Sequence, residues 1–339
     1  GARPWTPDDH HDYGFSTDNH HSDGSGICYA SRRRPMITTR SGYVTLPEPS
    51  GGSGLRHYPA DTHLYDWMET MGHDFDVVTD EDLHAEGVDL ISGYKVVMTG
   101  SHPEYHTEQT LDALEGYVAR GGRLMYLGGN GFYWRVAVHP DIDGAVEIRR
   151  GEGGIRAWAA EPGEYYNSFD GAYGGLWRRS GRAPQRLAGV GFSAQGTFVG
   201  SYYRRQAGAD DPRTAWIFEG VEDEILGDFG LSGGGAAGFE LDRVDYRLGS
   251  PPNVIVLASS EGHEQHFILV PEEMLTHLRT WPGEPAAKLL RADMVYFDTP
   301  NGGAVFSTGS ISFCGSLSHN DYDNNISRIL DNVLRRFKS

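Results

Sequence analysis

Cysteine is nearly absent from this chain of 339 residues, which contains only Cys28 and Cys314. So few cysteines exclude a disulfide framework, because scaffolds held by disulfides need several pairs. Both residues also stand in apolar, strand-like segments, where a small buried side chain is more common than a nucleophile. We therefore expect a protein of the cytoplasm, a reducing compartment, whose chemistry does not use a thiol.

Positive charge is also scarce, since 29 Lys and Arg residues stand against 47 Asp and Glu residues and the formal net charge is −18. This balance argues against nucleic acid and anionic membrane surfaces as partners, because both attract positive charge. No apolar run approaches the ~18 residues of a membrane span, and no charged-then-apolar leader opens the chain. Because the chain starts at Gly1 and not at Met, we expect a cut or processed piece.

The signatures of several common enzyme classes are missing. The sequence contains no GxSxG elbow, no Walker A loop and no HExxH motif. The glycine run Gly233–Gly238 does not follow a strand and open a helix, so it does not indicate a dinucleotide site. What is abundant is glycine, with 46 residues, together with 12% aromatic residues. This composition is typical of a turn-rich mixed α/β enzyme.

The stretch Tyr94–Trp134 carries the clearest structural pattern. An apolar run, Val96–Met98, is followed by a loop and then by a helix for which Thr107 is a suitable N-cap. A second apolar run, Leu124–Leu127, comes after the helix. This order of strand, loop, helix and strand predicts one unit of a parallel sheet, with both strands ending at the same edge.

Similar alternation on either side of this unit predicts the fold class. Helical spacing of apolar residues recurs in Thr62–Met71 and in Asn324–Phe337, and strands are expected between them, for example at Ala304–Ser307 and Ile311–Cys314. We therefore expect an α/β protein with a doubly wound, mostly parallel sheet.

The middle of the chain breaks this alternation. Its short β-branched and aromatic segments, such as Thr214–Glu219, are separated by Gly and Pro turns and predict a β-rich insertion or second lobe. We expect four parts: a polar N-terminal segment at 1–57 that contributes to the site, α/β parts at 58–145 and 261–339, and the β-rich part at 146–260.

Polar residues gather where the two strands of the central unit end. His102-Pro103-Glu104 follows the first strand, and Asn130 follows the second. Ligands bind outside the carboxyl ends of strands in open α/β sheets, so this edge is the candidate active site. A carboxylate there can ligate a metal, and an imidazole can transfer a proton. From spacing alone, Glu104 can equally cap the next helix, and Asn130 before Gly131 can be a plain turn residue.

Two further groups leave alternatives open. Glu240, between Phe239 and Leu241, is either a surface residue of an edge strand or a buried acid with a raised pKa. The His- and Asp-rich segment at 1–24 invites a zinc interpretation, but consecutive histidines rarely bind one ion and such termini are often disordered. We expect one or two of its residues to face the site.

A set of motifs in order along the chain then resembles a known family. HSDGSG and RRRP are followed by HPEY, GGRLMYLGGNGFYW, YGGLWRRSGR and GSISFCGSLSHN. Together they resemble the C-terminal region of the large (beta) subunit of the N,N-dimethylformamidase family. The likeness extends from about Tyr13 to Phe337. It implies a glutamine-amidotransferase-like α/β fold, although the cysteine nucleophile of a true glutamine amidotransferase is missing.

The resemblance also implies an activity and a cofactor. Members of the family hydrolyse small formamides with one Fe(III) held by two tyrosines and a glutamate. Glu104 matches the carboxylate ligand, while His102, Asn130 and Glu240 match catalytic positions around the iron. One family tyrosine lies upstream of this chain. Asp18 stands where the other is expected, with Tyr13 as the nearest tyrosine, so both are named as candidate metal ligands.

The expected reaction is hydrolysis of a dimethylformamide-like amide to formate and amine, with Fe(III) as Lewis acid. The resemblance further implies a small partner subunit and homo-oligomerisation. The alternative is a relative without catalysis, or with a different metal, that binds a small polar ligand.

Overall fold

The computed structural model describes residues 17, 20–34, 36–40, 42–44, 53–151, 153–263, 265, 267–274 and 286–339. Two predicted metal ligands, Tyr13 and Asp18, lie outside the described residues.

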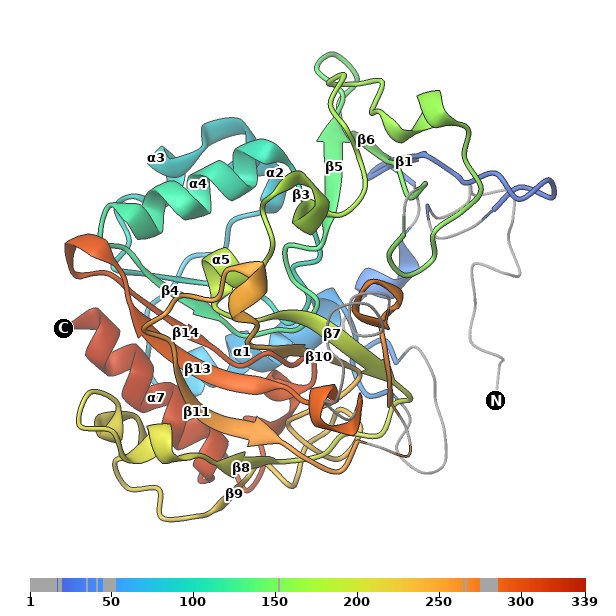
Figure 1. The fold of residues 1–339 in the computed structure, drawn as a ribbon. Coiled ribbons are helices and arrows are strands. Elements are labelled where there is room, and N and C mark those ends of the chain that lie inside the picture. The colour runs from blue at the N-terminus through green and yellow to red at the C-terminus, as the bar shows by residue number, and fades with distance from the viewer. Residues whose placement is uncertain are drawn as a thin grey trace.

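Fourteen strands form in the described part of the chain (Figure 1). In order they are β1 (Tyr29–Ser31), β2 (Val96–Met98), β3 (Tyr105–His106), β4 (Arg123–Tyr126), β5 (Trp134–Val138), β6 (Ala145–Ile148), β7 (Gly191–Gly196), β8 (Tyr203–Arg205), β9 (Ile225–Leu226), β10 (Glu240–Arg243), β11 (Ile255–Ser260), β12 (Phe267–Leu269), β13 (Asp293–Asp298) and β14 (Ala304–Ser307).

These strands build three sheets. The largest has seven strands in the order β2-β4-β14-β13-β11-β8-β9, and the two smaller sheets have the orders β1-β6-β5-β3 and β10-β7-β12. In the large sheet, β2, β4 and β14 are parallel neighbours, as the central unit predicted. The four remaining strands are antiparallel.

The expectation of a doubly wound, mostly parallel, glutamine-amidotransferase-like sheet is therefore wrong. A parallel neighbour requires a crossover, usually a helix. A helix connects β2 to β4, whereas β4 and its other parallel neighbour, β14, are separated in the chain by the strands β5 to β13. From β13 to β14 the chain instead turns back directly, with Thr299 N–H donating to the Gly303 carbonyl at 2.9 Å. The result is a mostly β protein with three mixed or antiparallel sheets.

α-Helices are fewer than strands in the described residues. They are α1 (Tyr58–Thr70), α2 (Asp80–Glu86), α3 (Val88–Ile91), α4 (Glu108–Ala119), α5 (Gln185–Ala188) and α7 (Asn325–Lys338). The side chains of Thr79, Thr107 and Asn324 accept hydrogen bonds from the first turns of α2, α4 and α7.

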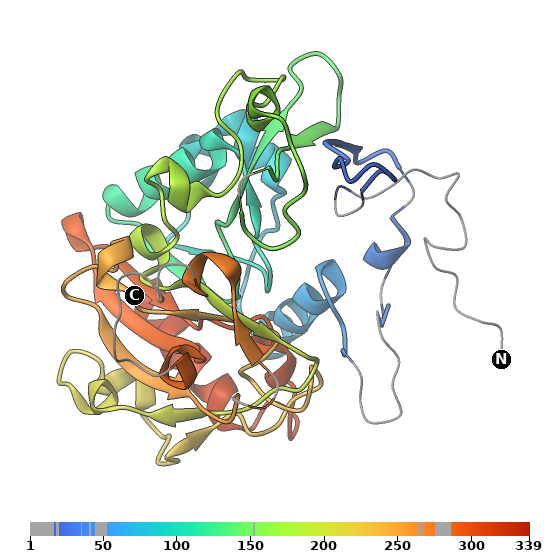
Figure 2. The same cartoon turned by 45° about the vertical axis from the view of Figure 1, so that its right-hand side comes forward.

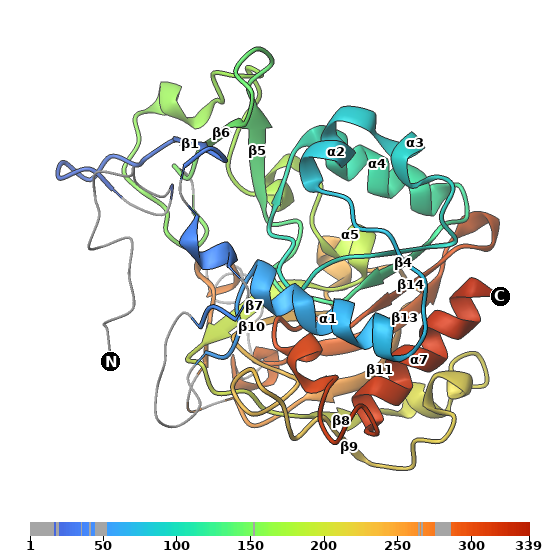
Figure 3. The same ribbon diagram turned by 180° about the vertical axis from the view of Figure 1, so that it is seen from behind.

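Helices cover both faces of the large sheet. The side chains of each strand alternate between the two faces, and each set packs against helices. On β4, Leu124 and Tyr126 pack in the cluster that contains α4, whereas Met125 packs in the cluster that contains α1 and α7. Figure 3 shows α1 and α7 side by side on the second face. The four-stranded sheet stands at one end of the molecule (Figure 1, Figure 2).

Two local strand predictions are wrong for the same reason. Thr214–Glu219 contains the 3-10 helix Ala215–Phe218, and Ile311–Cys314 runs into the 3-10 helix Phe313–Ser316. Both segments are short apolar runs that become buried, and periodicity alone does not distinguish a buried strand from a buried helical turn. The large sheet draws strands from all three parts expected after residue 57, and the part boundaries themselves stay a prediction.

Within the described residues, no helix is both long enough and apolar enough to cross a lipid bilayer.

Candidate active site

Two loops, which follow β2 and β4, form the floor of the candidate site. Their backbones are joined by hydrogen bonds: Gly129 N–H donates to the Ser101 carbonyl, Phe132 N–H to that of Pro103 and Tyr133 N–H to that of Glu104, at 3.3, 2.8 and 3.0 Å. The parallel pairing of β2 and β4 brings both strand ends to one edge, as predicted. The loops are therefore held as one rigid unit.

Glycine is required where these loops come closest to their neighbours. A Cβ atom on Gly128 would lie 2.4 Å from the Ser101 carbonyl oxygen, and one on Gly129 would lie 2.7 Å from that of Glu240. Side chains at these positions would push the loops apart and move the β10 strand away. The two glycines thus allow residues distant in sequence to meet.

His102 lies between two carboxylates. Its Nε2 atom is 3.1 Å from Glu104 Oε2 and 3.1 Å from Glu240 Oε2. The three side chains are only 8%, 13% and 17% exposed. Burial opposes protonation of the ring, but the charges of Glu240 and Glu104 outweigh it and raise the pKa of His102 to about 10. The cluster is therefore a charged group held out of water.

Glu240 is the residue that sequence spacing could not place. It opens β10, and the close approach of Gly129 brings it beside His102. Burial works against its ionisation, but the charge of His102 prevails and keeps the pKa of Glu240 below its usual range, with the Asn130 amide acting in the same direction. The sequence left two alternatives open, a surface residue of an edge strand or a buried acid with a raised pKa. Glu240 is largely buried, but its pKa is lowered and not raised.

Asn130 completes the group with a neutral amide. It is 2% exposed and has a left-handed backbone, with φ of 50°. Such a conformation costs a non-glycine residue roughly 1–2 kcal/mol, so the surrounding structure must stabilise it. His102, Glu104, Asn130 and Glu240, all predicted as site residues, therefore lie together. Their chemical roles stay predictions.

The cluster retains unused hydrogen-bonding capacity. Within the described residues, His102 Nε2, Glu240 Oε2 and Asn130 Oδ1 are buried without a hydrogen-bond partner. His102 Nε2 and Glu240 Oε2 nevertheless face each other as an ion pair at 3.1 Å. Buried polar atoms are normally satisfied, so the remaining atom, Asn130 Oδ1, indicates a place for a ligand.

Three nearby residues were missed by sequence reasoning. The ring of His57 stacks on that of His102, with centroids 5.9 Å apart. Asp61 accepts hydrogen bonds from the Ser101 backbone and hydroxyl at 2.7 and 2.8 Å, which fixes the residue before His102. Arg56 lies against the rings of Phe198 and Phe239. Arg56 and His57 precede α1 and Asp61 lies in its first turn, so none of the three lies at the end of a strand, where sequence reasoning placed the site.

The donors fit a hard cation in their chemistry but do not complete a site. Glu104 and the unsatisfied oxygens of Glu240 and Asn130 are oxygen donors, the type that Fe(III) prefers. Within the described residues, however, no group of three His, Cys, Asp or Glu side chains is arranged to hold a metal ion. Of the predicted metal ligands, Glu104 lies within the described residues, and Asp18 and Tyr13 lie outside them.

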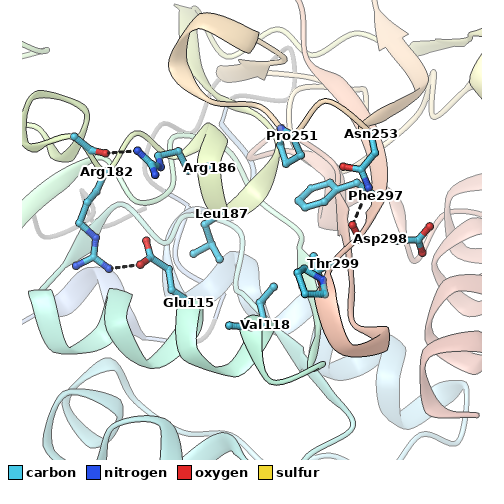
Figure 4. A pocket seen from close by; sticks show the side chains of 13 residues that line it. Glu115, Val118, Arg182, Arg186, Leu187, Pro251, Asn253, Phe297, Asp298 and Thr299 are labelled. Atoms are coloured by element: carbon cyan, nitrogen blue, oxygen red, sulfur yellow. Dashed lines mark hydrogen bonds and ion pairs between the residues drawn. The ribbon is translucent and has the colours of Figure 1, made fainter.

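A separate groove, with a volume of about 480 Å³, lies between α4, α5 and the β13–β14 turn (Figure 4). Its apolar floor includes Val118, Leu187 and Phe297, and its polar rim is largely self-paired, with Arg182 contacting Glu115 at 2.8 Å. None of its lining residues belongs to the predicted site. We assign no chemistry to it, because the ionisable cluster lies elsewhere.

Comparison with known proteins places these observations in a family. Residues 10–324 match the family described as N,N-dimethylformamidase beta subunit-like, C-terminal. Two curated relatives are both named N,N-dimethylformamidase beta subunit: one from Paracoccus aminophilus is 47% identical over 328 residues, and one from Alcaligenes sp is 46% identical over 328 residues. Each alignment covers 96% of this chain and 42% of the relative. The chain thus spans less than half the length of these relatives.

Proposed function

The chain belongs to the N,N-dimethylformamidase beta subunit-like family, as its motifs predicted, and from this membership we propose that it hydrolyses a small N-substituted formamide to formate and an amine. The observation that carries the proposal is the buried cluster in which His102 Nε2 lies 3.1 Å from both Glu104 and Glu240. Charged groups are kept out of water at a cost, and active sites are where proteins accept that cost.

The proposed reaction breaks the C–N bond of the formamide and forms a bond from water oxygen to the formyl carbon. The Glu240–His102 pair takes one proton from the attacking water and returns one to the departing amine. The Asn130 amide carries two N–H groups, one for Glu240 and one for the developing oxyanion. One such donor is typically worth about 3 kcal/mol of transition-state stabilisation.

We also propose a mononuclear Fe(III) cofactor with Glu104 as one of its ligands. The chemistry that Fe(III) supplies when bound is Lewis-acid activation of water and of the amide carbonyl. Support comes from the oxygen-rich donors at this position and from Glu104, which projects into the cluster from the stiff His102-Pro103-Glu104 loop.

The aromatic residues that follow Asn130 do not line the substrate pocket in this proposal. Phe132 and Trp134 are 1% and 0% exposed and pack in the core. Phe198 is half-buried and lies against both Arg56 and the ring of Phe239, so in this proposal it is better placed to contact N-alkyl groups.

Partners belong to the proposal as well. Both relatives are named as a beta subunit, and a subunit has a partner. We propose that this chain assembles with a second, smaller subunit and forms an oligomer.

The experiment replaces Glu104 with Ala in the protein as isolated and measures metal content and formamide hydrolysis. We expect iron to be lost and hydrolysis to fall to background, while the circular dichroism spectrum stays unchanged. The matched control is Glu222→Ala, at an exposed glutamate remote from the cluster in sequence. Normal iron content in Glu104→Ala would refute the ligand assignment.

Wild-type protein without metal and without activity would favour the alternative of a non-catalytic relative that binds a small polar ligand. Activity restored only by a different metal would favour a differently metallated hydrolase.

A further inference from the structure

The backbone around Asn130 is held in an unusual shape. Both Asn130 and Phe132 have left-handed φ angles, 50° and 54°, without being glycine. Residues in this region of backbone space persist only when their surroundings determine them. Two buried side chains form the surroundings that hold this turn.

Asp242 and Tyr126 bind the backbone of this turn directly. Asn130 N–H donates to Asp242 Oδ1 at 2.8 Å, and Gly131 N–H donates to the Tyr126 hydroxyl oxygen at 2.7 Å. The Tyr126 hydroxyl in turn donates to Asp242 Oδ2 at 2.7 Å. Three hydrogen bonds thus close a buried ring that takes both N–H groups of the turn.

We call this hydrogen-bonded group of Tyr126 and Asp242 the clamp. Its two side chains come from different sheets. Tyr126 ends β4 in the large sheet, and Asp242 lies on β10 in the three-stranded sheet, where Asp242 N–H donates to the Gly309 carbonyl at 2.9 Å. A register shift separates Leu241 from Asp242. Glu240 and Asp242 are two positions apart on β10 and therefore face the same side of the strand. Both serve the same partner, because Glu240 lies beside the Asn130 side chain and Asp242 binds its backbone.

We propose that Asp242 is a positioning residue for the reaction, which, together with Tyr126, fixes the Asn130 turn so that the Asn130 amide faces His102 and Glu240. Asp242 itself is 0% exposed and has no access to substrate. This proposal rests on the function proposed above, because the clamp positions the Asn130 side chain, which is the proposed donor to the developing oxyanion.

The experiment compares Asp242→Ala, Asp242→Asn, Tyr126→Phe, Asn130→Ala and the double variant Asp242→Ala/Asn130→Ala. Asn130→Ala should lower kcat about 10²-fold, which is the loss typical of one oxyanion donor. Asp242→Ala should lower kcat by a similar factor, with KM changed less than about threefold, because the lost interaction forms in the transition state. Asp242→Asn keeps an oxygen acceptor and should restore most of the rate.

The double variant separates positioning from a merely structural role. If Asp242 acts through Asn130, the double variant should be no slower than Asn130→Ala by more than about threefold, whereas independent effects would multiply to about 10⁴-fold. Multiplying effects, or an Asp242→Asn variant as slow as Asp242→Ala, would overturn the proposal. If Asp242→Ala fails to fold, Tyr126→Phe, paired with Asn130→Ala in the same cycle, carries the test.

A crystal structure of Asp242→Ala or Tyr126→Phe gives a readout that does not depend on the activity. Release of Asn130 from the left-handed conformation would support the clamp even if the wild-type protein hydrolysed no formamide. An unchanged turn in both variants would refute the clamp even if the protein proved to be an active formamidase.

Discussion

Two buried histidines in this molecule have opposite electrostatic surroundings. His102 lies 3.1 Å from two carboxylates, which overcome the effect of burial and raise its pKa to about 10. His263, 1% exposed, has Ser260 Oγ at 2.7 Å from its Nε2 atom, and burial lowers its pKa to about 4. The first ring is kept charged and the second neutral.

The difference separates a functional cluster from core packing. A neutral histidine with a hydroxyl partner is a common way to fill a core, because no charge leaves water. The group of His102, Glu104 and Glu240 is costly by comparison, since a hydrophobic replacement of a buried ion pair is often neutral or stabilising. Such a cluster indicates a use beyond folding, and variants of the two histidines test this interpretation.

Among the histidine and asparagine variants, the largest expected effect is that of His102→Gln. Removing the cation leaves two buried carboxylates facing each other, so we expect the free energy of unfolding to fall by about 3 kcal/mol. Formamide hydrolysis should fall by about 10³-fold, because a positioned proton-transfer group is lost. Urea denaturation and initial rates measure the two effects.

His263→Gln is the matched control for that variant, since it also removes a buried imidazole but no charged contact. Its rate of hydrolysis should equal that of the wild type at pH 7.5. Equal losses of activity in the two variants would show that the contrast between the clusters has no functional meaning.

Asn130 gives the next largest effect and has matched variants of its own. Asn130→Ala and Asn130→Gly both remove the amide, so both should lower kcat about 10²-fold. They differ in the backbone, because glycine adopts the left-handed conformation freely and alanine does not. Asn130→Gly should therefore be more stable than Asn130→Ala by about 1 kcal/mol in urea denaturation. A rate near wild type in the glycine variant would mean that only the backbone shape matters.

Sequence reasoning recovered those parts of this molecule that depend on neighbours in the chain. Thr107 caps α4, as predicted, because its side chain reaches the Thr110 N–H three residues ahead, a local relation visible in the sequence. The parallel pair β2 and β4 followed from one strand–helix–strand unit. His102, Glu104 and Asn130 could be placed together for the same reason.

The features that sequence spacing could not predict depend on contacts between distant segments of the chain. Glu240 arrives on a strand that pairs with β7, and no local pattern around it announces that pairing. The Asp242–Tyr126 hydrogen bond joins residues 116 positions apart. In the antiparallel part of the large sheet only β13 and β14 are joined by a short turn, whereas β11 pairs with β8 and with β13 across long intervening segments. A family resemblance named Glu240 where spacing could not.

The smallest expected effect is the contribution of His263 to the pH dependence of the free energy of unfolding. An unfolded histidine titrates near pH 6.5, whereas His263 in the folded protein titrates near 4. Because the folded pKa is the lower one, the unfolded state binds the extra proton between these values. The stability that the neutral ring contributes is therefore fully present above pH 6.5 and is lost as the pH falls toward 4, by about 3 kcal/mol in all.

His263→Gln should remove this part of the pH dependence. The free energy of unfolding, measured by urea denaturation at pH 7.5, 5.5 and 4.5, should decrease less steeply in the variant than in the wild type, while activity at pH 7.5 is retained. The wild-type protein, measured at the same three pH values, provides the control. If the free energy of unfolding of His263→Gln depended on pH as steeply as that of the wild type, the buried ring of His263 would already be protonated near pH 6. The two histidines would then differ only in the carboxylates beside His102.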